Sequence, residues 1–144
     1  MCLVDVNVPS FSVKRQCEVI DPADGLENSV FIFDDVACDK QDNIREYFSM
    51  GRYKNIDSAY LCQTYSKIPK QLIRDNCNML VLFRQDDLNL KHIFDEHVSP
   101  DLTYEQFKKI CSDCWNNPFG ALVIVKEFDL HNGRYRCGFD KYIR

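Results

Sequence analysis

The segment Ser29–Asp35 constrains the fold of this chain more than any other, because an apolar run ends there directly in two carboxylates. Its apolar part, Val30 to Phe33, is the short unbroken run typical of a strand buried on both faces, as in a parallel sheet. Open α/β sheets bind ligands beyond the carboxyl ends of their strands, which is where Asp34 and Asp35 fall. The simpler interpretation is a strand that ends in a polar turn, and this segment alone favours it.

The next segments predict a strand–helix–strand unit. Apolar residues at helical spacing between Gln41 and Met50 predict a helix, and Gly51 is placed to end it. The mostly apolar run Asp57–Cys62 predicts a second strand, which is followed by Gln63. Polar residues therefore follow both strands at the same end, as expected for a βαβ unit.

The remaining pattern extends this unit into a larger sheet. Pro69 is placed to begin a helix, and the apolar run Met79–Phe83 predicts the next strand. Near the C-terminus, Asn132-Gly133 between the strand-like segments Ala121–Val125 and Tyr135–Phe139 predicts a hairpin. The sequence therefore predicts an α/β fold with three layers, in which helices cover a mostly parallel sheet that ends in a C-terminal antiparallel hairpin.

Four motifs occur in a fixed order along the chain: Phe31–Asp35, Ser49–Ile56, Tyr60–Tyr65 and Ile68–Asn76. In this order and spacing they resemble the poxvirus-type DNA-packaging ATPases. These belong to the FtsK–HerA branch of P-loop motors, with relatives in large DNA viruses, virophages and Polinton-like elements. The resemblance continues to residues 135–140 and covers roughly residues 29–144. Each motif alone is weak, whereas their combination is fairly specific.

The resemblance implies Mg²⁺-dependent ATP hydrolysis at the subunit interfaces of a homo-oligomeric ring that drives double-stranded DNA into a viral capsid. Asp34 would hold Mg²⁺ through water, and Asp35 would activate the attacking water, although many relatives in the wider superfamily have Glu there. Gln63 would contact the γ-phosphate as a sensor. Arg52 is the first candidate for an arginine finger and Arg74 the second. For each arginine the alternative is an ordinary solvated charge.

One element of the family pattern is missing. A P-loop requires Gly-x-x-x-x-Gly-Lys-Ser/Thr after a strand, yet the chain contains no Gly-Lys pair, and Gly25 is the only glycine before Asp34. We therefore expect a single ATPase-like domain over residues 1–144, in which residues 1–28 are a divergent or truncated N-terminal segment and residues 29–144 run from the Walker B strand to the end of the core. Val4, Val6 and Val8 alternate in a way that suits one strand.

Two explanations account for the missing P-loop. The gene product starts upstream of Met1, which we favour because the downstream spacing is orderly, or the chain is a degenerate copy. The corresponding alternative function is a non-catalytic relic or adaptor that keeps the fold and the oligomer interface and binds partners. A weaker alternative is a helicase-type or segregation-type DNA motor. Capsid or portal-vertex proteins are further expected partners of a packaging subunit.

Composition and charge limit the expected partners and cellular compartment of the protein. The net charge of −4 argues against a protein that coats nucleic acid by bulk positive charge, but a ring motor needs only a few basic residues facing its pore. No apolar run approaches the ~20 residues that span a bilayer. The N-terminus lacks the pattern of a signal peptide. We therefore expect no membrane association and a reducing intracellular compartment (a cytoplasmic viral factory or the nucleus), where the eight cysteines remain thiols.

Cys111-x-x-Cys114 has the spacing of zinc ligands, but zinc needs four ligands and the sequence has no second such pair. Both cysteines also fall on the apolar stripe of a helix, for which Thr103 and Gln106 predict an N-terminal capping box. We therefore expect these thiols to face the core rather than bind metal.

Overall fold

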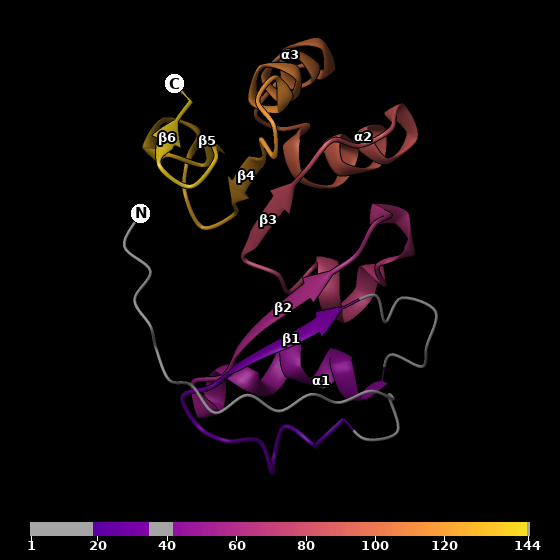
Figure 1. Cartoon of the computed structure of the whole chain (residues 1–144), viewed down its shortest axis with the longest axis vertical. Coiled ribbons are helices and arrows are strands. Elements are labelled where there is room, and N and C mark those ends of the chain that lie inside the picture. Colours follow the sequence, from indigo (N-terminus) through magenta and orange to yellow (C-terminus); the bar gives the residue numbers. More distant parts are fainter. Residues whose placement is uncertain (1–18, 35–41, 144) are drawn as a thin grey trace.

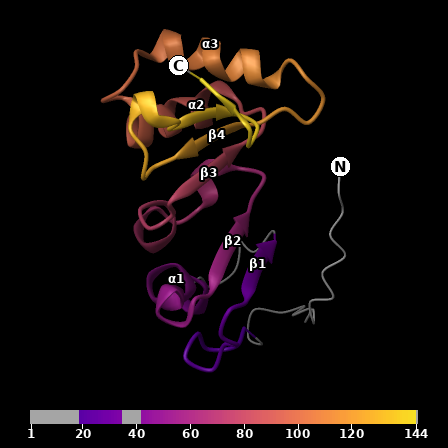
Figure 2. The ribbon, with the colours of Figure 1, turned by 90° about the vertical axis from the view of Figure 1, so that its left-hand side faces the viewer.

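The computed structural model describes residues 19–34 and 42–143, which form two separate β-sheets with helices packed against them (Figures 1 and 2). The strands and α-helices are β1 (Val30–Asp34), α1 (Asp42–Met50), β2 (Asp57–Leu61), β3 (Met79–Leu82), α2 (Asp87–Ile93), α3 (Tyr104–Trp115), β4 (Leu122–Val125), β5 (Tyr135–Cys137) and β6 (Lys141–Tyr142). Short 3₁₀ or π turns lie at η2 (Gly51–Lys54), η3 (Tyr65–Lys67), η4 (Lys70–Arg74), η5 (Phe94–Val98) and η6 (Leu130–Asn132).

The predicted βαβ unit is confirmed by β1, α1 and β2. The two strands are parallel, with Val30 opposite Asp57 and Asp34 opposite Leu61. Helix α1 packs on one face of this sheet because Ile44 and Tyr47, one turn apart, are almost fully buried there. The Tyr47 ring contacts Phe31 and Phe33, which project from the same face of β1.

The opposite face of the two-stranded sheet is open. Val30 and Ile32 point away from α1, and each remains 64% exposed. The prediction that β1 is buried on both faces is therefore wrong. The alternation of exposed and buried residues along the strand reflects a single covering helix.

Two asparagines align the starts of the parallel strands. Asn28 and Asn55 both have left-handed backbone conformations, with φ of 56° and 54°, which asparagine tolerates better than most residues. The side-chain amide of Asn55 donates to Asn28 Oδ1 at 2.8 Å. The backbone N–H of Asn28 also donates to Lys54 O. These contacts fix where β1 and β2 begin relative to each other.

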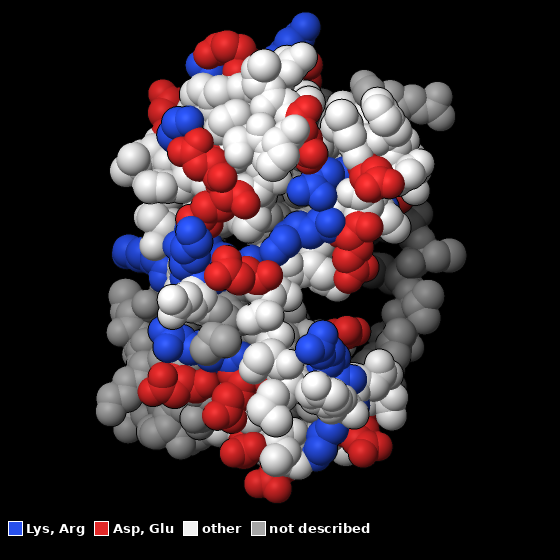
Figure 3. Space-filling view, turned by 180° about the vertical axis from the view of Figure 1, so that it is seen from behind, with Lys and Arg blue, Asp and Glu red and all other residues white. Residues whose placement is uncertain are grey.

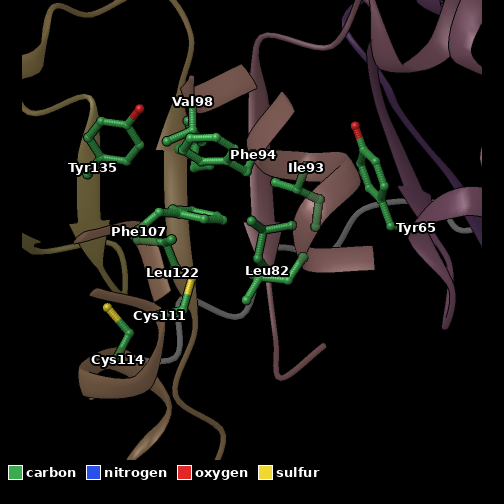
Figure 4. Close-up of a cluster of buried hydrophobic side chains, with 12 residues drawn as sticks. Tyr65, Leu82, Ile93, Phe94, Val98, Phe107, Cys111, Cys114, Leu122 and Tyr135 are labelled. Carbon is green, nitrogen blue, oxygen red and sulfur yellow. The ribbon is translucent and has the colours of Figure 1, made fainter. Parts of the chain in front are cut away.

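The second sheet has the order β3-β4-β5-β6, and all its pairs are antiparallel. Strand β4 is buried along its whole length and forms the middle of the larger core with α2 and α3 (Figure 4). Asp86 accepts from the backbone N–H of Asn89 at the start of α2, and Thr103 and Gln106 form the predicted capping box of α3. The antiparallel pairing of β4 with β5 confirms the C-terminal hairpin, although the connection is longer than a two-residue turn.

The predicted fold class is wrong. We expected a mostly parallel three-layer sheet of P-loop type, but β3 pairs with β4 in antiparallel register rather than with β2. Among the described strands, only β1 and β2 pair in parallel. The cause is the apolar strand β4, in which Leu122, Val123 and Ile124 are fully buried and which pairs with β3 along its whole length. An apolar run of four residues shows that β3 is a strand but not which strand it pairs with.

The expectation that Cys111 and Cys114 face the core is confirmed, since both lie on the buried face of α3. Burial raises the pKa of each thiol to about 12, so both stay protonated at neutral pH. They act as small apolar groups within the larger core. Among the described residues, no helix is both long enough and apolar enough to span a membrane.

Phe107→Ala is expected to lower the free energy of unfolding by about 3–5 kcal/mol, because the ring is fully buried in the larger core beside Phe94 and its loss leaves a cavity. Urea denaturation followed by circular dichroism measures this change. Leu88→Ala is the matched control, since Leu88 is 67% exposed on α2 and its truncation should shift stability by no more than about 0.5 kcal/mol. Equal losses in both variants would contradict the described core.

Candidate functional site

A cleft of about 1080 Å³ separates the two sheets, and β2 and β3 form its walls. The space-filling view from behind shows a hollow between the part with the four-stranded sheet and the part with the two-stranded sheet (Figure 3). Basic and acidic side chains both lie around this hollow. Four of the five predicted site residues line the cleft, namely Asp34, Arg52, Gln63 and Arg74. The fifth, Asp35, lies outside the described residues.

Asp34 and Gln63 lie at the same edge of the two-stranded sheet. Asp34 is the last residue of β1 and is paired in register with Leu61, the last residue of β2, and Gln63 follows two positions later. Both side chains are exposed and line the cleft. Among the described residues none makes a hydrogen bond or ion pair with the Asp34 carboxylate, so that side chain is available to a ligand. The parallel register therefore brings together an acid and an amide that are 29 positions apart in the sequence.

Arg52 lies at the opposite end of the cleft from Asp34. It belongs to η2, which precedes β2, whereas Asp34 is level with the carboxyl end of β2. Its guanidinium is exposed and lies 5.6 Å from the ring centroid of Tyr53. The length of β2 separates Arg52 from Asp34, so the two side chains do not meet within this chain.

Arg74 is held in place by other residues of the chain. Its Nη1 atom lies 2.8 Å from both carboxylate oxygens of Glu96, and the two side chains are only 12% and 16% exposed. The guanidinium also lies over the ring of Tyr65, 4.9 Å from its centroid. A partly buried ion pair with a stacked guanidinium is a fixed arrangement. Arg74 is therefore positioned by the protein rather than presented to solvent.

Tyr65, Arg74, Glu96 and His97 form one buried group, which we call the Tyr65 cluster. The hydroxyl of Tyr65 lies 2.7 Å from Glu96 Oε2 and 2.6 Å from His97 Nε2. Burial, together with the hydrogen bond to Glu96, raises the pKa of Tyr65 well above its usual value, so the hydroxyl stays protonated and donates a hydrogen bond to Glu96. The neutral imidazole of His97 then donates from Nε2 to the tyrosine oxygen.

The segment that carries Gln63 is anchored to α2 by a second contact. The backbone N–H of Ser66 donates to Asn89 Oδ1 at 3.0 Å, and the amide nitrogen of Asn89 donates to Asp86 at 2.7 Å. Asn89 is buried. Since Tyr65 and Ser66 closely follow Gln63, these contacts fix the chain where it leaves β2. Sequence reasoning did not identify the Tyr65 cluster; the available signal was an aromatic residue within a polar segment beside Gln63.

The sheet edge that carries Asp34 could bind Mg²⁺ only if other ligands, such as water or phosphate oxygens, complete the coordination of the metal. Among the described residues no group of three or more His, Cys, Asp or Glu side chains is arranged to hold a metal ion. Mg²⁺ commonly keeps several waters and binds through one or two carboxylates together with substrate phosphates. The exposed carboxylate of Asp34 fits this mode of binding.

Comparison of the chain with protein-family models, with curated proteins and with solved structures returned no match.

Arg74→Ala is expected to lower the free energy of unfolding by about 3 kcal/mol, because it removes the guanidinium whose Nη1 contacts both carboxylate oxygens of the mostly buried Glu96. Arg52→Ala is the matched control, since it removes an exposed arginine on the same cleft and should change stability by no more than about 0.5 kcal/mol. Chemical denaturation of the two variants measures the difference. A loss with Arg52→Ala as large as that with Arg74→Ala would contradict the described ion pair.

The stability of the protein is expected to fall as the pH decreases from about 6.5 to about 4, in part through His97. Burial, assisted by the Lys126 ammonium, lowers the pKa of His97 from 6.5 to about 4 in the folded protein. The unfolded chain therefore binds a proton in this range that the folded protein does not bind, which favours unfolding by up to about 3 kcal/mol at the acid end.

His97→Gln should remove that part of the pH dependence, which urea denaturation at pH 4.5 and pH 7.5 measures. His131→Gln, at an exposed site, should keep it. The assignment fails if the wild type and His97→Gln lose the same stability between these two pH values.

Proposed function

We propose that this chain is part of a Mg²⁺-dependent ATPase subunit of a homo-oligomeric ring that moves double-stranded DNA into a viral capsid. The observation that carries the proposal is the convergence of Asp34 and Gln63 at one edge of a parallel strand pair, facing a large cleft. An acid and a neutral amide at adjacent strand ends suit the binding of Mg²⁺ and the contact with a γ-phosphate. The ordered motifs that resemble the packaging ATPases supply the choice of nucleotide and of DNA.

In this proposal each residue has a defined role. Mg²⁺ bound with ATP would neutralise charge on the phosphates, and Asp34 would hold it through water. Asp35, next in the sequence, would orient the attacking water. Gln63 would contact the terminal phosphate, and the Tyr65 cluster would connect its position to the C-terminal sheet. Arg52 is the better candidate for a finger that acts on a neighbouring subunit, because Arg74 is bound to Glu96.

The phosphate-binding loop is the part of such a site that this sequence lacks, as it contains no Gly-Lys pair. Backbone amides of a glycine-rich loop and its lysine normally supply most of the contacts to the phosphates. We therefore propose that catalysis requires polypeptide beyond the sequence described, and that this chain alone contributes the metal-binding and sensing edge.

The non-catalytic adaptor is the second candidate function. It is favoured by the engagement of Arg74 with Glu96, which leaves one of the two candidate fingers unable to reach a neighbouring nucleotide without breaking a buried ion pair. In that case the cleft would bind a partner protein, and Asp34 would be an ordinary exposed carboxylate.

Binding of ATP to this chain distinguishes the two candidates. With a fluorescent ATP analogue, we expect weak binding that requires Mg²⁺ and that Asp34→Asn weakens about tenfold, as for the loss of a charged metal ligand. Asp57→Asn is the matched control, because Asp57 is an exposed acid at the other end of the same strand pair and should have no effect. In an assembly that includes a phosphate-binding loop, Asp34→Asn or Asp35→Asn should abolish turnover.

Binding that is insensitive to both Mg²⁺ and Asp34→Asn would reject the nucleotide site. Absence of binding, combined with undiminished turnover of Asp34→Asn in the larger assembly, would reject the ATPase assignment and leave the adaptor.

A further inference from the structure

A second cavity, of about 290 Å³, lies beside the C-terminal strands and shares no lining residue with the cleft between the two sheets. Polar side chains from three elements line it, namely His131 and Asn132 of η6, Arg136 of β5 and Tyr142 of β6. In Figures 1 and 2, β5 and β6 lie away from the two-stranded sheet. The volume is near the lower end of the range for ligand pockets, roughly 300–1,000 Å³, and is sufficient for a small chemical group.

Arg136 is fixed in this cavity by its own chain. Its Nε atom donates to Gly133 O at 3.0 Å, and Nη1 donates more weakly to Phe139 O at 3.5 Å. The guanidinium carbon lies 5.4 Å from the ring centroid of Phe128 and 4.8 Å from that of Tyr142. These contacts hold the guanidinium in one orientation and leave Nη2 without a partner among the described residues.

The half-buried Arg136 also lacks a carboxylate partner within the described part of the chain. Each of the three other half-buried arginines described there has one: Arg45 pairs with Asp42, Arg74 with Glu96 and Arg134 with Asp101. Among the described residues that line the cavity, none is Asp or Glu. A fixed positive charge in a cavity without carboxylates is suited to an anion that comes from outside the chain.

Further hydrogen-bond donors line the same cavity. The Tyr142 hydroxyl and the His131 ring make no hydrogen bond with any described residue, and each can donate at least one at neutral pH. Asn132 donates to Asp129 Oδ2 at 3.3 Å, which uses one of the two hydrogens of its amide nitrogen. Donors from several elements suit the tetrahedral oxygens of a phosphate better than the two coplanar oxygens of a carboxylate.

We propose that this cavity binds a phosphate group, which accepts hydrogen bonds from Arg136 Nη2, the Tyr142 hydroxyl and the His131 ring. The phosphate belongs either to a small phosphorylated molecule or to a DNA backbone, since both present the same oxygens. The inference goes beyond the proposed ATPase site, and it stands whether or not the Asp34 edge binds a nucleotide.

Titration of the wild-type chain with inorganic phosphate tests the site directly. The experiment is done without Mg²⁺ and ATP, at neutral pH and at an ionic strength held constant with sodium chloride. We expect saturable changes in the NMR shifts of the backbone amides of Gly133, Arg136 and Tyr142, and about tenfold weaker binding of acetate. The absence of a saturable change, or equal binding of acetate, would overturn the proposal.

Two variants test the donors. Arg136→Gln should weaken phosphate binding about tenfold, while Arg84→Gln is the matched control, because Arg84 is exposed outside the cavity and its loss should change nothing. Tyr142→Phe keeps the ring that packs on Gly133 and removes only the hydroxyl, so it should weaken binding about threefold. Circular dichroism shows whether each variant is folded. Wild-type affinity in Tyr142→Phe, or in folded Arg136→Gln, would overturn the assignment.

Two phosphate esters then identify the source of the group. Binding of glycerol 3-phosphate, without binding of a short DNA duplex, would assign the cavity to small phosphorylated molecules. A duplex that shifts the same amides and is displaced by inorganic phosphate would assign it to the DNA backbone. Failure of both esters to bind would overturn the proposal. None of these results depends on Asp34 or on Mg²⁺, so they are separable from failure of the nucleotide site.

Discussion

The hydroxyl of Tyr65 links the segment that leaves β2 to the larger core, which contains the four-stranded sheet. Its backbone belongs to the segment that leaves β2, while its ring is buried in the larger core and its oxygen contacts Glu96 and His97. The two apolar cores are otherwise distinct, and Ile68 packs against both. A buried hydrogen-bonded group of this kind fixes a unique arrangement because each member would be costly to leave without a partner. A few side chains therefore hold the two walls of the cleft in their relative position.

The local features of the fold could be predicted from the sequence, whereas the partners of the third strand could not. Helix α3 begins at Thr103 because the capping residues lie within one turn, and β1–α1–β2 follows from apolar spacing over about thirty residues. The partner of β3 depends on β4, whose pairing places Met79 opposite Val125, far along the chain. A short apolar run does not indicate which strand it pairs with, because tertiary packing determines the pairing.

The candidate site also has one part that could be predicted from the sequence and one part that could not. The approach of Asp34 to Gln63 follows from two parallel strands that end at the same level, so it could be expected from strand positions alone. The ion pair of Arg74 could not be expected, because its partner Glu96 lies 22 positions away on another element and no spacing rule relates the two residues. Sequence patterns therefore indicated which side chains reach the cleft, while long-range contacts decide whether each one is available there.

The left-handed pair Asn28 and Asn55 has a consequence for sequence divergence. Each position has positive φ, which strongly disfavours β-branched and bulky residues, and the bridge between the two side chains adds a second constraint. A one-residue slip of β2 against β1 would bring Ile56 or Lys54 opposite Asn28 and would turn the apolar side chains of the strand to the wrong face. Chains that share this strand pair should therefore retain Asn, Asp or Gly at both positions at nearly constant separation, even where the apolar residues between them have been exchanged. This pair offers a short signature for finding distant relatives.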